Sequence, residues 1–66
     1  MNYYVIQIFF QNDFREASYK SKLSFKDLVY KYVVVNYNGK NRVGIMVAKT
    51  TKPKYQCKEI IKILEV

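Results

Sequence analysis

Residues 32–47 have the sequence Tyr32-Val33-Val34-Val35-Asn36-Tyr37-Asn38-Gly39-Lys40-Asn41-Arg42-Val43-Gly44-Ile45-Met46-Val47, which is the strongest structural signal in the chain. β-branched and aromatic residues flank Asn38-Gly39 on both sides and predict a hairpin of two strands, over 32–37 and 40–49. Asn-Gly is typical of a two-residue type I′ turn, because both central residues take positive φ there. This hairpin indicates a mainly β fold.

The register of the hairpin divides its side chains between two faces. We expect one apolar, inward face that carries Tyr32, Val34, Val43, Ile45 and Val47. We expect an opposite, outer face that carries Val33, Val35, Tyr37, Lys40, Arg42, Gly44 and Met46. A four-residue loop would keep this assignment, whereas a three-residue loop would reverse it.

Two further strands are predicted before the hairpin. Residues 3–10 are an apolar run interrupted only by Gln7, which predicts a strand covered on both faces, as in a barrel. Residues 11–13 form the turn that follows. Residues 14–23 alternate and predict a half-buried strand, with Ala17, Tyr19 and Leu23 on one face and Glu16, Ser18, Lys20 and Lys22 on the other.

A short helix is predicted between these strands and the hairpin. The segment 24–27 resembles a capping box with Asp27 in place of Glu or Gln. Apolar residues then follow at helical spacing, at Phe25, Leu28, Val29 and Tyr32, so we expect one or two helical turns near 25–31. Residues 55–66 permit a helix or a strand, and their β-branched content favours a strand that closes the sheet. About five strands and one helical turn predict a small SH3-like or OB-like barrel.

Length and composition predict one small domain, over residues 1–66. The only cysteine, Cys57, cannot pair within the chain, fits a reducing compartment and is expected to be buried. The apolar N-terminal run carries no Lys or Arg at its start and no small-residue cleavage site, so we expect neither a signal peptide nor a membrane span. These features predict a cytoplasmic protein.

The residues needed for most catalytic and metal sites are missing. The chain has no histidine, so it has no ordinary general base near neutral pH. Ser18, Ser21 and Ser24 have no partner that would activate them, and the five carboxylates are scattered. No metal-ligand spacing and no phosphate-binding glycine loop is present. The sequence therefore predicts a binding module without catalytic activity, cofactor or metal.

A formal charge of +7 indicates a polyanionic partner. Cations that contact phosphates and aromatic rings that stack on bases together are typical of single-stranded nucleic-acid binding. The predicted binding residues are Tyr37, Lys40, Arg42, Lys49, Lys52, Lys54, Lys20 and Lys22. The alternative interpretation is that Tyr37 covers the end of a barrel and that the lysines only keep the protein soluble.

A second class of function is protein interaction. If the outer hairpin face is uncovered, then Val33, Val35, Tyr37 and Met46 form an apolar patch that would contact a partner or a second copy in a homodimer. A cavity for anionic small molecules between subunits is a further alternative, supported only by charge and aromatic content.

The segments 32–35, 38–39, 42–47 and 57–64 together resemble SH3-like β-barrels. They are similar to the small N-terminal DNA-binding domain of the primosomal helicase PriA, in which a hydrophobic strand leads through a hairpin to a basic residue and a Val/Ile-Gly-Ile-Val-type strand. Small proteins of bacteriophages and mobile elements have a similar pattern. The chain differs from the helicase in lacking its motor and in having residues 25–31 where a short turn is usual. The resemblance implies that Arg42 and the hairpin lie at the binding surface.

These observations predict nucleic-acid binding first. The alternative is a phage or mobile-element accessory protein that binds and inhibits a host protein or nucleoprotein, as in counter-defence, in the cytoplasm of a bacterial host.

Overall fold

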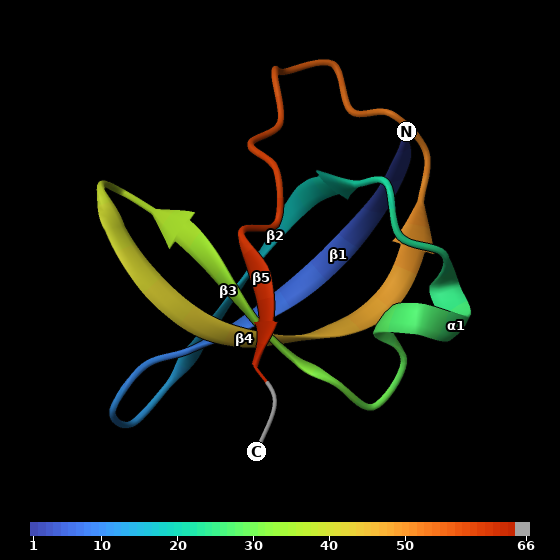
Figure 1. The fold of residues 1–66 in the computed structure, drawn as a ribbon. Coiled ribbons are helices and arrows are strands. Elements are labelled where there is room, and N and C mark those ends of the chain that lie inside the picture. The colour runs from blue at the N-terminus through green and yellow to red at the C-terminus, as the bar shows by residue number, and fades with distance from the viewer. Residues whose placement is uncertain (65–66) are drawn as a thin grey trace.

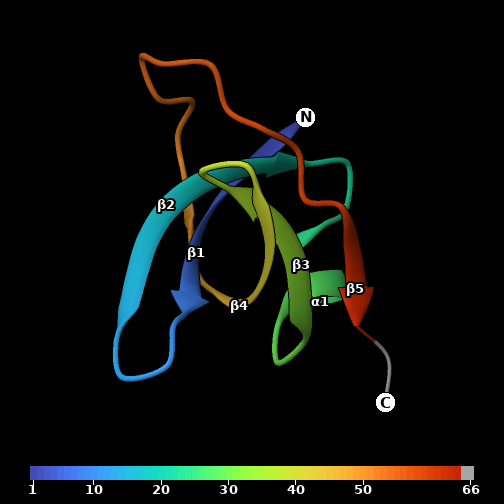
Figure 2. The same cartoon turned by 90° about the vertical axis from the view of Figure 1, so that its left-hand side faces the viewer.

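The chain forms one strongly curved antiparallel sheet with a short helix at its side, and the computed structural model describes residues 1–64 (Figures 1 and 2). The elements follow the chain as β1 (Asn2–Phe9), β2 (Phe14–Ser21), α1 (Phe25–Leu28), β3 (Tyr32–Tyr37), β4 (Lys40–Thr50) and β5 (Lys62–Leu64). The spatial order of the strands is β2-β1-β4-β3-β5. The prediction of a mainly β fold with about five strands and one short helix is confirmed.

The β3–β4 hairpin has the predicted register but the opposite orientation. Asn38 and Gly39 have φ values of 51° and 84°, and Tyr32 lies opposite Ile45. The inward face, however, is the one that carries Val33, Val35 and Met46, which are all buried. The expected inward residues Tyr32, Val43 and Val47 are instead exposed. β3 is apolar on both faces, so its own pattern could not decide which side meets the core.

Gly44 explains why the inward face of β4 has a gap in its apolar pattern. It lies opposite Ile8 in the antiparallel pair of β4 and β1. A Cβ atom at this position would lie 2.7 Å from the Gln7 carbonyl oxygen and 2.7 Å from Cγ2 of Ile6. A shift of register between Val5 and Ile6 marks a bulge in the same pair of strands and strengthens the bend.

The central strand β1 is buried on one face only, so the prediction that both faces are covered is wrong. Tyr4, Ile6 and Ile8 point inward and are fully buried, whereas Phe9 on the other face is 39% exposed. The outer face stays open because the chain supplies no second layer there. β2 alternates as predicted, with Tyr19 buried on its inward face.

The helix α1 begins with the predicted capping box. The Ser24 side chain accepts from the Asp27 N–H, and the Asp27 carboxylate accepts from the Ser24 N–H. The helix forms one turn, within the predicted length, and ends at Leu28 because Val29 returns to an extended conformation. Leu28 is fully buried and anchors the helix to the core, while Phe25 stays exposed.

The segment that precedes β5 links the two sides of the curved sheet. The Lys20 N–H donates to the Lys58 carbonyl at 3.0 Å, and the Ile60 N–H donates to the Lys20 carbonyl at 2.9 Å. The Ile61 N–H donates to the Val34 carbonyl at 2.8 Å, and β5 then pairs with β3. A strand within 55–66 is thus confirmed for Lys62–Leu64, while residues 65–66 lie outside the described residues.

The core lies inside the curve of the sheet. It is formed by Tyr4, Ile6, Ile8, Tyr19, Leu28, Val33, Val35, Met46 and Ile60. Cys57 is buried and free, as predicted. No helix within residues 1–64 has the length and apolar character needed to cross a membrane.

Candidate functional site

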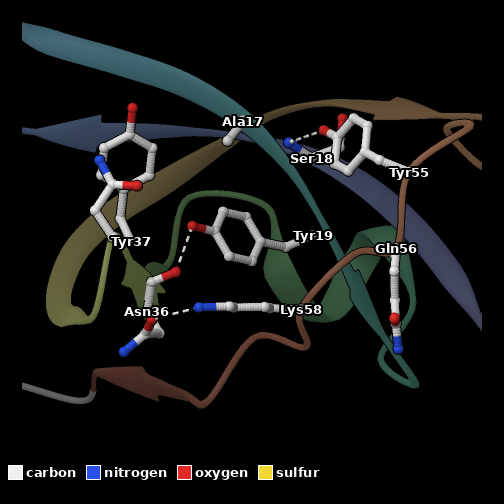
Figure 3. Close-up of a pocket in the computed structure, with 9 residues that line it drawn as sticks. Ala17, Ser18, Tyr19, Asn36, Tyr37, Tyr55, Gln56 and Lys58 are labelled. Carbon is white, nitrogen blue, oxygen red and sulfur yellow. Dashed lines mark hydrogen bonds between the residues drawn. The ribbon is translucent and has the colours of Figure 1, made fainter.

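A cleft of about 220 Å³ opens where β2 and β3 face each other without pairing (Figure 3). The strand β2 supplies one wall, the end of β3 and its turn supply the other, and the loop after β4 lies across the opening. The lining residues are Ala17, Ser18, Tyr19, Asn36, Tyr37, Asn38, Tyr55, Gln56 and Lys58. The lining contains three tyrosines, three amides and one lysine but no carboxylate, so it favours neutral polar or anionic ligands.

Hydrogen bonds hold the floor of the cleft in place. The Tyr19 hydroxyl donates to the Asn36 carbonyl at 2.7 Å, and Lys58 Nζ donates to the Asn36 side-chain oxygen at 2.8 Å (Figure 3). The Asn36 side-chain amide in turn donates to Asn41 at 3.3 Å. Asn36 therefore joins β3, β4 and the segment before β5, and it fixes one wall of the cleft.

Tyr19 forms the buried floor and stays protonated over the physiological range. Burial, together with smaller contributions from the nearby Tyr37, Tyr55 and Cys57, raises its pKa to about 12. The hydroxyl is therefore a permanent donor to Asn36. Tyr37 and Tyr55 line the same cleft as Tyr19.

The two arginines of the chain gather around one aromatic ring at the end of the cleft. The Arg42 guanidinium carbon lies 4.2 Å from the centre of the Phe10 ring, and the Arg15 carbon lies 5.7 Å from it. Tyr37 meets the same ring edge-to-face at 5.8 Å between ring centres. We call Phe10, Arg15, Tyr37 and Arg42 the arginine–aromatic cluster. Because Tyr37 also lines the cleft, the cluster and the cleft are continuous.

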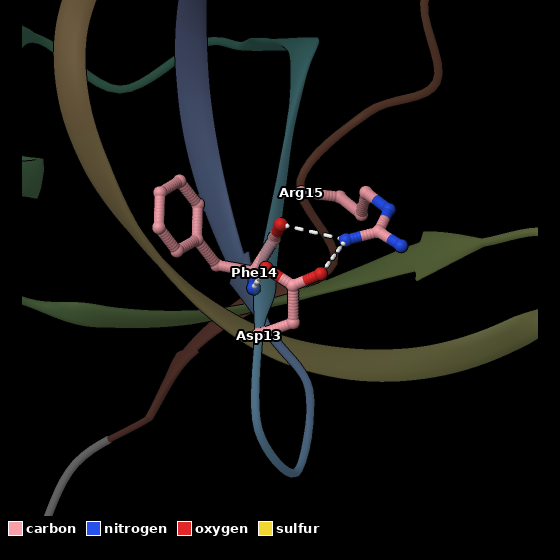
Figure 4. A network of polar contacts seen from close by, with 3 residues as sticks. All are labelled: Asp13, Phe14 and Arg15. Atoms are coloured by element: carbon pink, nitrogen blue, oxygen red, sulfur yellow. Dashed lines mark hydrogen bonds and ion pairs between the residues drawn. The ribbon is translucent and has the colours of Figure 1, made fainter.

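The two arginines differ in their partners. Arg15 forms an ion pair with Asp13 and also donates to the Phe14 carbonyl at 3.0 Å (Figure 4). This contact with Arg15 and the Phe14 N–H lower the pKa of Asp13 and keep it ionised. Arg42 has no carboxylate within ion-pair distance among residues 1–64. The half-buried Arg42 guanidinium is therefore the cation of the cluster that is left to bind an external anion.

The structure divides the predicted binding residues into two groups. Tyr37, Lys40 and Arg42 do share one face of the hairpin, but it is the inward face and not the outer one. They lie near the end of that face, where it leaves the core, so Lys40 is exposed and the other two are half-buried.

The remaining lysines lie elsewhere. Lys20 lies opposite Tyr3, near the start of β1, and Lys49 lies opposite Tyr4 on the other side of that strand. Lys22 follows β2 at the same end, and Lys52 and Lys54 are exposed in the loop after β4. These five lysines are therefore not brought together with Arg42.

Phe10 and Arg15 were not among the predicted binding residues. Phe10 continues the alternate, inward-facing positions Tyr4, Ile6 and Ile8 of β1. Arg15 occupies one of the alternate positions of β2 that share the inward face with Tyr19. A cation at an inward position of an alternating strand is the signal that could have identified Arg15. The amides and Tyr55 of the cleft could not be predicted from the neighbouring sequence, because the loop after β4 meets β2 only in the folded chain.

The exposed side of the sheet is an apolar surface. Phe9, Phe14, Tyr32 and Val43 are each 37–48% exposed, and we call them the outer apolar face. The rings of Phe9 and Tyr32 meet edge-to-face at 6.1 Å between their centres. This face replaces the predicted patch, because Val33, Val35 and Met46 are buried and Tyr37 is half-buried.

No protein-family model, no curated protein and no solved structure matches this chain. The resemblance to SH3-like barrels and to the DNA-binding domain of PriA therefore stays a prediction. The function has to be inferred from the cleft, the arginine–aromatic cluster and the distribution of charge.

Proposed function

We propose that this protein is a non-enzymatic module that binds nucleic acid through the arginine–aromatic cluster. The observation that carries the proposal is the Arg42 guanidinium, which lies 4.2 Å from the Phe10 ring centre and has no carboxylate partner among residues 1–64. A planar guanidinium binds a phosphate through two N–H groups at once. Lys40 adds a second cation on the same face of the hairpin.

The lysines outside the cluster support the proposal through the field of the whole protein. A formal charge of +7 on 66 residues raises the local concentration of a polyanion and speeds its approach. Lys20, Lys22, Lys49, Lys52 and Lys54 contribute to this field from other parts of the surface. We assign them to long-range attraction and flanking phosphate contacts, and Tyr37, Lys40 and Arg42 to the contact itself.

The resemblance to the DNA-binding domain of PriA supports the same function, since it also places Arg42 and the hairpin at the binding surface. We further propose that the protein acts in the cytoplasm, because nucleic acid is present there and the thiol of Cys57 stays reduced. The similarity to small phage and mobile-element proteins suggests a bacterial host.

A titration with labelled DNA and RNA tests the proposal at about 50 mM and about 200 mM salt. We expect binding at low salt that weakens as salt rises. Arg42→Gln should weaken binding. It should also reduce the slope of the logarithm of the binding constant against the logarithm of the salt concentration, by about 0.7–0.9 for each phosphate that the variant no longer neutralises. Lys26→Gln removes the same charge from α1 and should change the slope little. Arg42→Lys keeps the charge without the planar fork and should retain only part of the affinity.

Two results would contradict this proposal. One is the absence of any binding at low salt by the wild-type protein. The other is equal weakening by Arg42→Gln and Lys26→Gln, since net charge alone would then explain the attraction.

A second candidate function is favoured by the outer apolar face. Four half-exposed apolar side chains on one sheet face are typical of a surface that contacts another protein. Because the chain carries a charge of +7, an acidic protein suits this surface better than a second copy, although a homodimer through the same face is the alternative. In this function the protein is an accessory factor of a phage or mobile element that binds and inhibits a host protein.

A further inference from the structure

The cleft between β2 and β3 has the shape of a site for one planar ring system. In Figure 3 the rings of Tyr37 and Tyr55 lie on either side of Ala17, with Tyr19 below. The volume of about 220 Å³ is smaller than the roughly 300–1,000 Å³ of most small-molecule sites, so a single flat group fits better than a larger ligand. Tyr55 is 57% exposed, so one side of its ring is open to a ligand.

Two neutral amides that line the cleft are free to bind a ligand. The side-chain amides of Asn38 and Gln56 make no hydrogen bond to any of residues 1–64. Each amide offers both donors and an acceptor, as the edges of the nucleobases do. The nearest carboxylate along β2, that of Glu16, lies on the outer face opposite Gln7 and not in the cleft.

Cations adjoin the β3 wall of the cleft. Lys58 Nζ is held 2.8 Å from the Asn36 side-chain oxygen on this wall. The arginine–aromatic cluster adjoins the same wall through Tyr37, the next residue of β3. A strand of nucleic acid that enters the cleft therefore meets cations beside the neutral amides and rings.

We infer that the cleft binds one unstacked base of a single-stranded nucleic acid, stacked on the exposed ring of Tyr55. This inference rests on the proposed function and adds to it a preference for single strands. A base inside a duplex is stacked on both faces and cannot enter the cleft, whereas an unstacked base exposes its faces and edges. The flanking phosphates then lie against Lys58 and Arg42.

A pair of oligonucleotides with equal charge tests the inference. One is a short oligothymidylate, and the other has the same length of sugar–phosphate backbone without bases. Fluorescence anisotropy at low salt should show about tenfold tighter binding of the oligothymidylate, because a strand without bases can neither stack nor hydrogen-bond in the cleft. An oligouridylate of the same length compares RNA with DNA, and a preference of either sign agrees with the inference.

Two variants of Tyr55 separate the ring from its hydroxyl group. Tyr55→Leu should remove most of the preference for the base-bearing strand, while Tyr55→Phe keeps the ring and should retain it. Tyr55 is exposed and its hydroxyl only accepts from the Ser18 N–H at 3.3 Å, so both variants should fold, which far-UV circular dichroism checks.

The outcomes distinguish the inference from the proposed function. Equal binding of both oligonucleotides with a normal salt dependence would overturn the base site and leave nucleic-acid binding in place. No binding of either at low salt would overturn both. Binding of a proline-rich peptide at the cleft, with the two oligonucleotides equal, would assign the tyrosines to a protein ligand and overturn the inference.

Discussion

Arg42 illustrates how the position of a residue in a strand determines what its side chain can do. It occupies an inward position of β4, yet it lies close to the end of the core, beside the ring of Phe10, which directly follows β1. The guanidinium lies 4.2 Å from the centre of that ring, and a cation at this distance gains about 0.5–2 kcal/mol. The ring restricts the guanidinium without neutralising it, which leaves its charge for an anion.

The buried hydroxyl of Tyr19 predicts a loss of stability at high pH. Its pKa is about 12 in the folded chain against 10.0 for a free tyrosine, because burial disfavours the ionised form. A raised pKa means that its contribution is fully present below pH 10 and is lost as the pH rises from 10 to about 12. We expect the free energy of unfolding, measured by urea denaturation, to fall across this interval.

Tyr19→Phe isolates this effect. It should cost about 1 kcal/mol at neutral pH, because it removes the hydrogen bond to the Asn36 carbonyl. It should also remove much of the decrease in the free energy of unfolding between pH 10 and about 12. Tyr4 accounts for the pH dependence that remains in this variant, since burial also raises the pKa of Tyr4. Identical pH profiles for Tyr19→Phe and the wild type would contradict this assignment.

At the scale of the elements, local sequence determines the turns and the register but not the orientation of the sheet. Asn38-Gly39 set the hairpin, and Ser24 with Asp27 set the start of α1, because both depend on neighbouring residues. Which face of the hairpin meets the core was not predictable. Val33 and Val34 are equally apolar, and the choice between them depends on packing with distant residues of the core.

The cleft depends on contacts between distant segments. Tyr55 meets Ser18, and Lys58 meets Asn36, only when the loop after β4 lies across β2 and β3. The pattern of residues 55–66 is compatible with a helix or a strand, so it carries no signal for these contacts. Tyr37 was predicted as a binding residue from its own type and neighbours, whereas its cleft partners were not.

Gly44 makes the curvature of β4 testable. Gly44→Ala places a Cβ atom 2.7 Å from the Gln7 carbonyl oxygen, which is backbone and cannot turn aside. We expect a destabilisation of about 1–3 kcal/mol in urea denaturation, as for other overpacked cores. Gly39→Ala is the comparison, because its Cβ meets nothing within 4 Å and its cost of about 1–2 kcal/mol comes only from positive φ.

The two glycine variants should also differ in their effect on the sheet. Gly44→Ala should weaken the pairing of β4 with β1, which hydrogen exchange would detect as weaker protection of the Ile6 to Ile8 amides. Gly39→Ala should affect the hairpin turn and leave those amides protected. Wild-type stability and protection in Gly44→Ala would show that β4 does not approach β1 this closely.

At the scale of the whole molecule, a thin apolar core leaves one side of the sheet without cover. A chain this short buries only about 60% of the surface that its unfolded form exposes. All the fully buried side chains lie inside the curve of the sheet, and Phe9, Tyr32 and Val43 remain half-exposed on its outer side. The cations of the cluster and the outer apolar face are therefore separate surfaces that can be tested independently.

Val43→Glu tests whether the outer apolar face binds an acidic protein. Val43 is 37% exposed on the outer side of β4, so the carboxylate should be tolerated but should repel an acidic partner and oppose burial. Ile61→Glu makes the same change at a 49% exposed position outside this face. We expect a partner captured from nuclease-treated bacterial lysate to be released by Val43→Glu and retained by Ile61→Glu.

Binding of oligonucleotides and the oligomeric state complete this prediction. Both glutamate variants should lower nucleic-acid affinity equally, because each lowers the net charge by one and neither touches the arginine–aromatic cluster.

The wild type should sediment as a monomer at micromolar concentration and low salt, since two copies of charge +7 repel each other. A dimer that Val43→Glu dissociates and Ile61→Glu does not would assign the face to a second copy instead. Capture that is insensitive to both variants, or that disappears with nuclease, would leave the outer apolar face without a protein ligand and favour nucleic-acid binding alone.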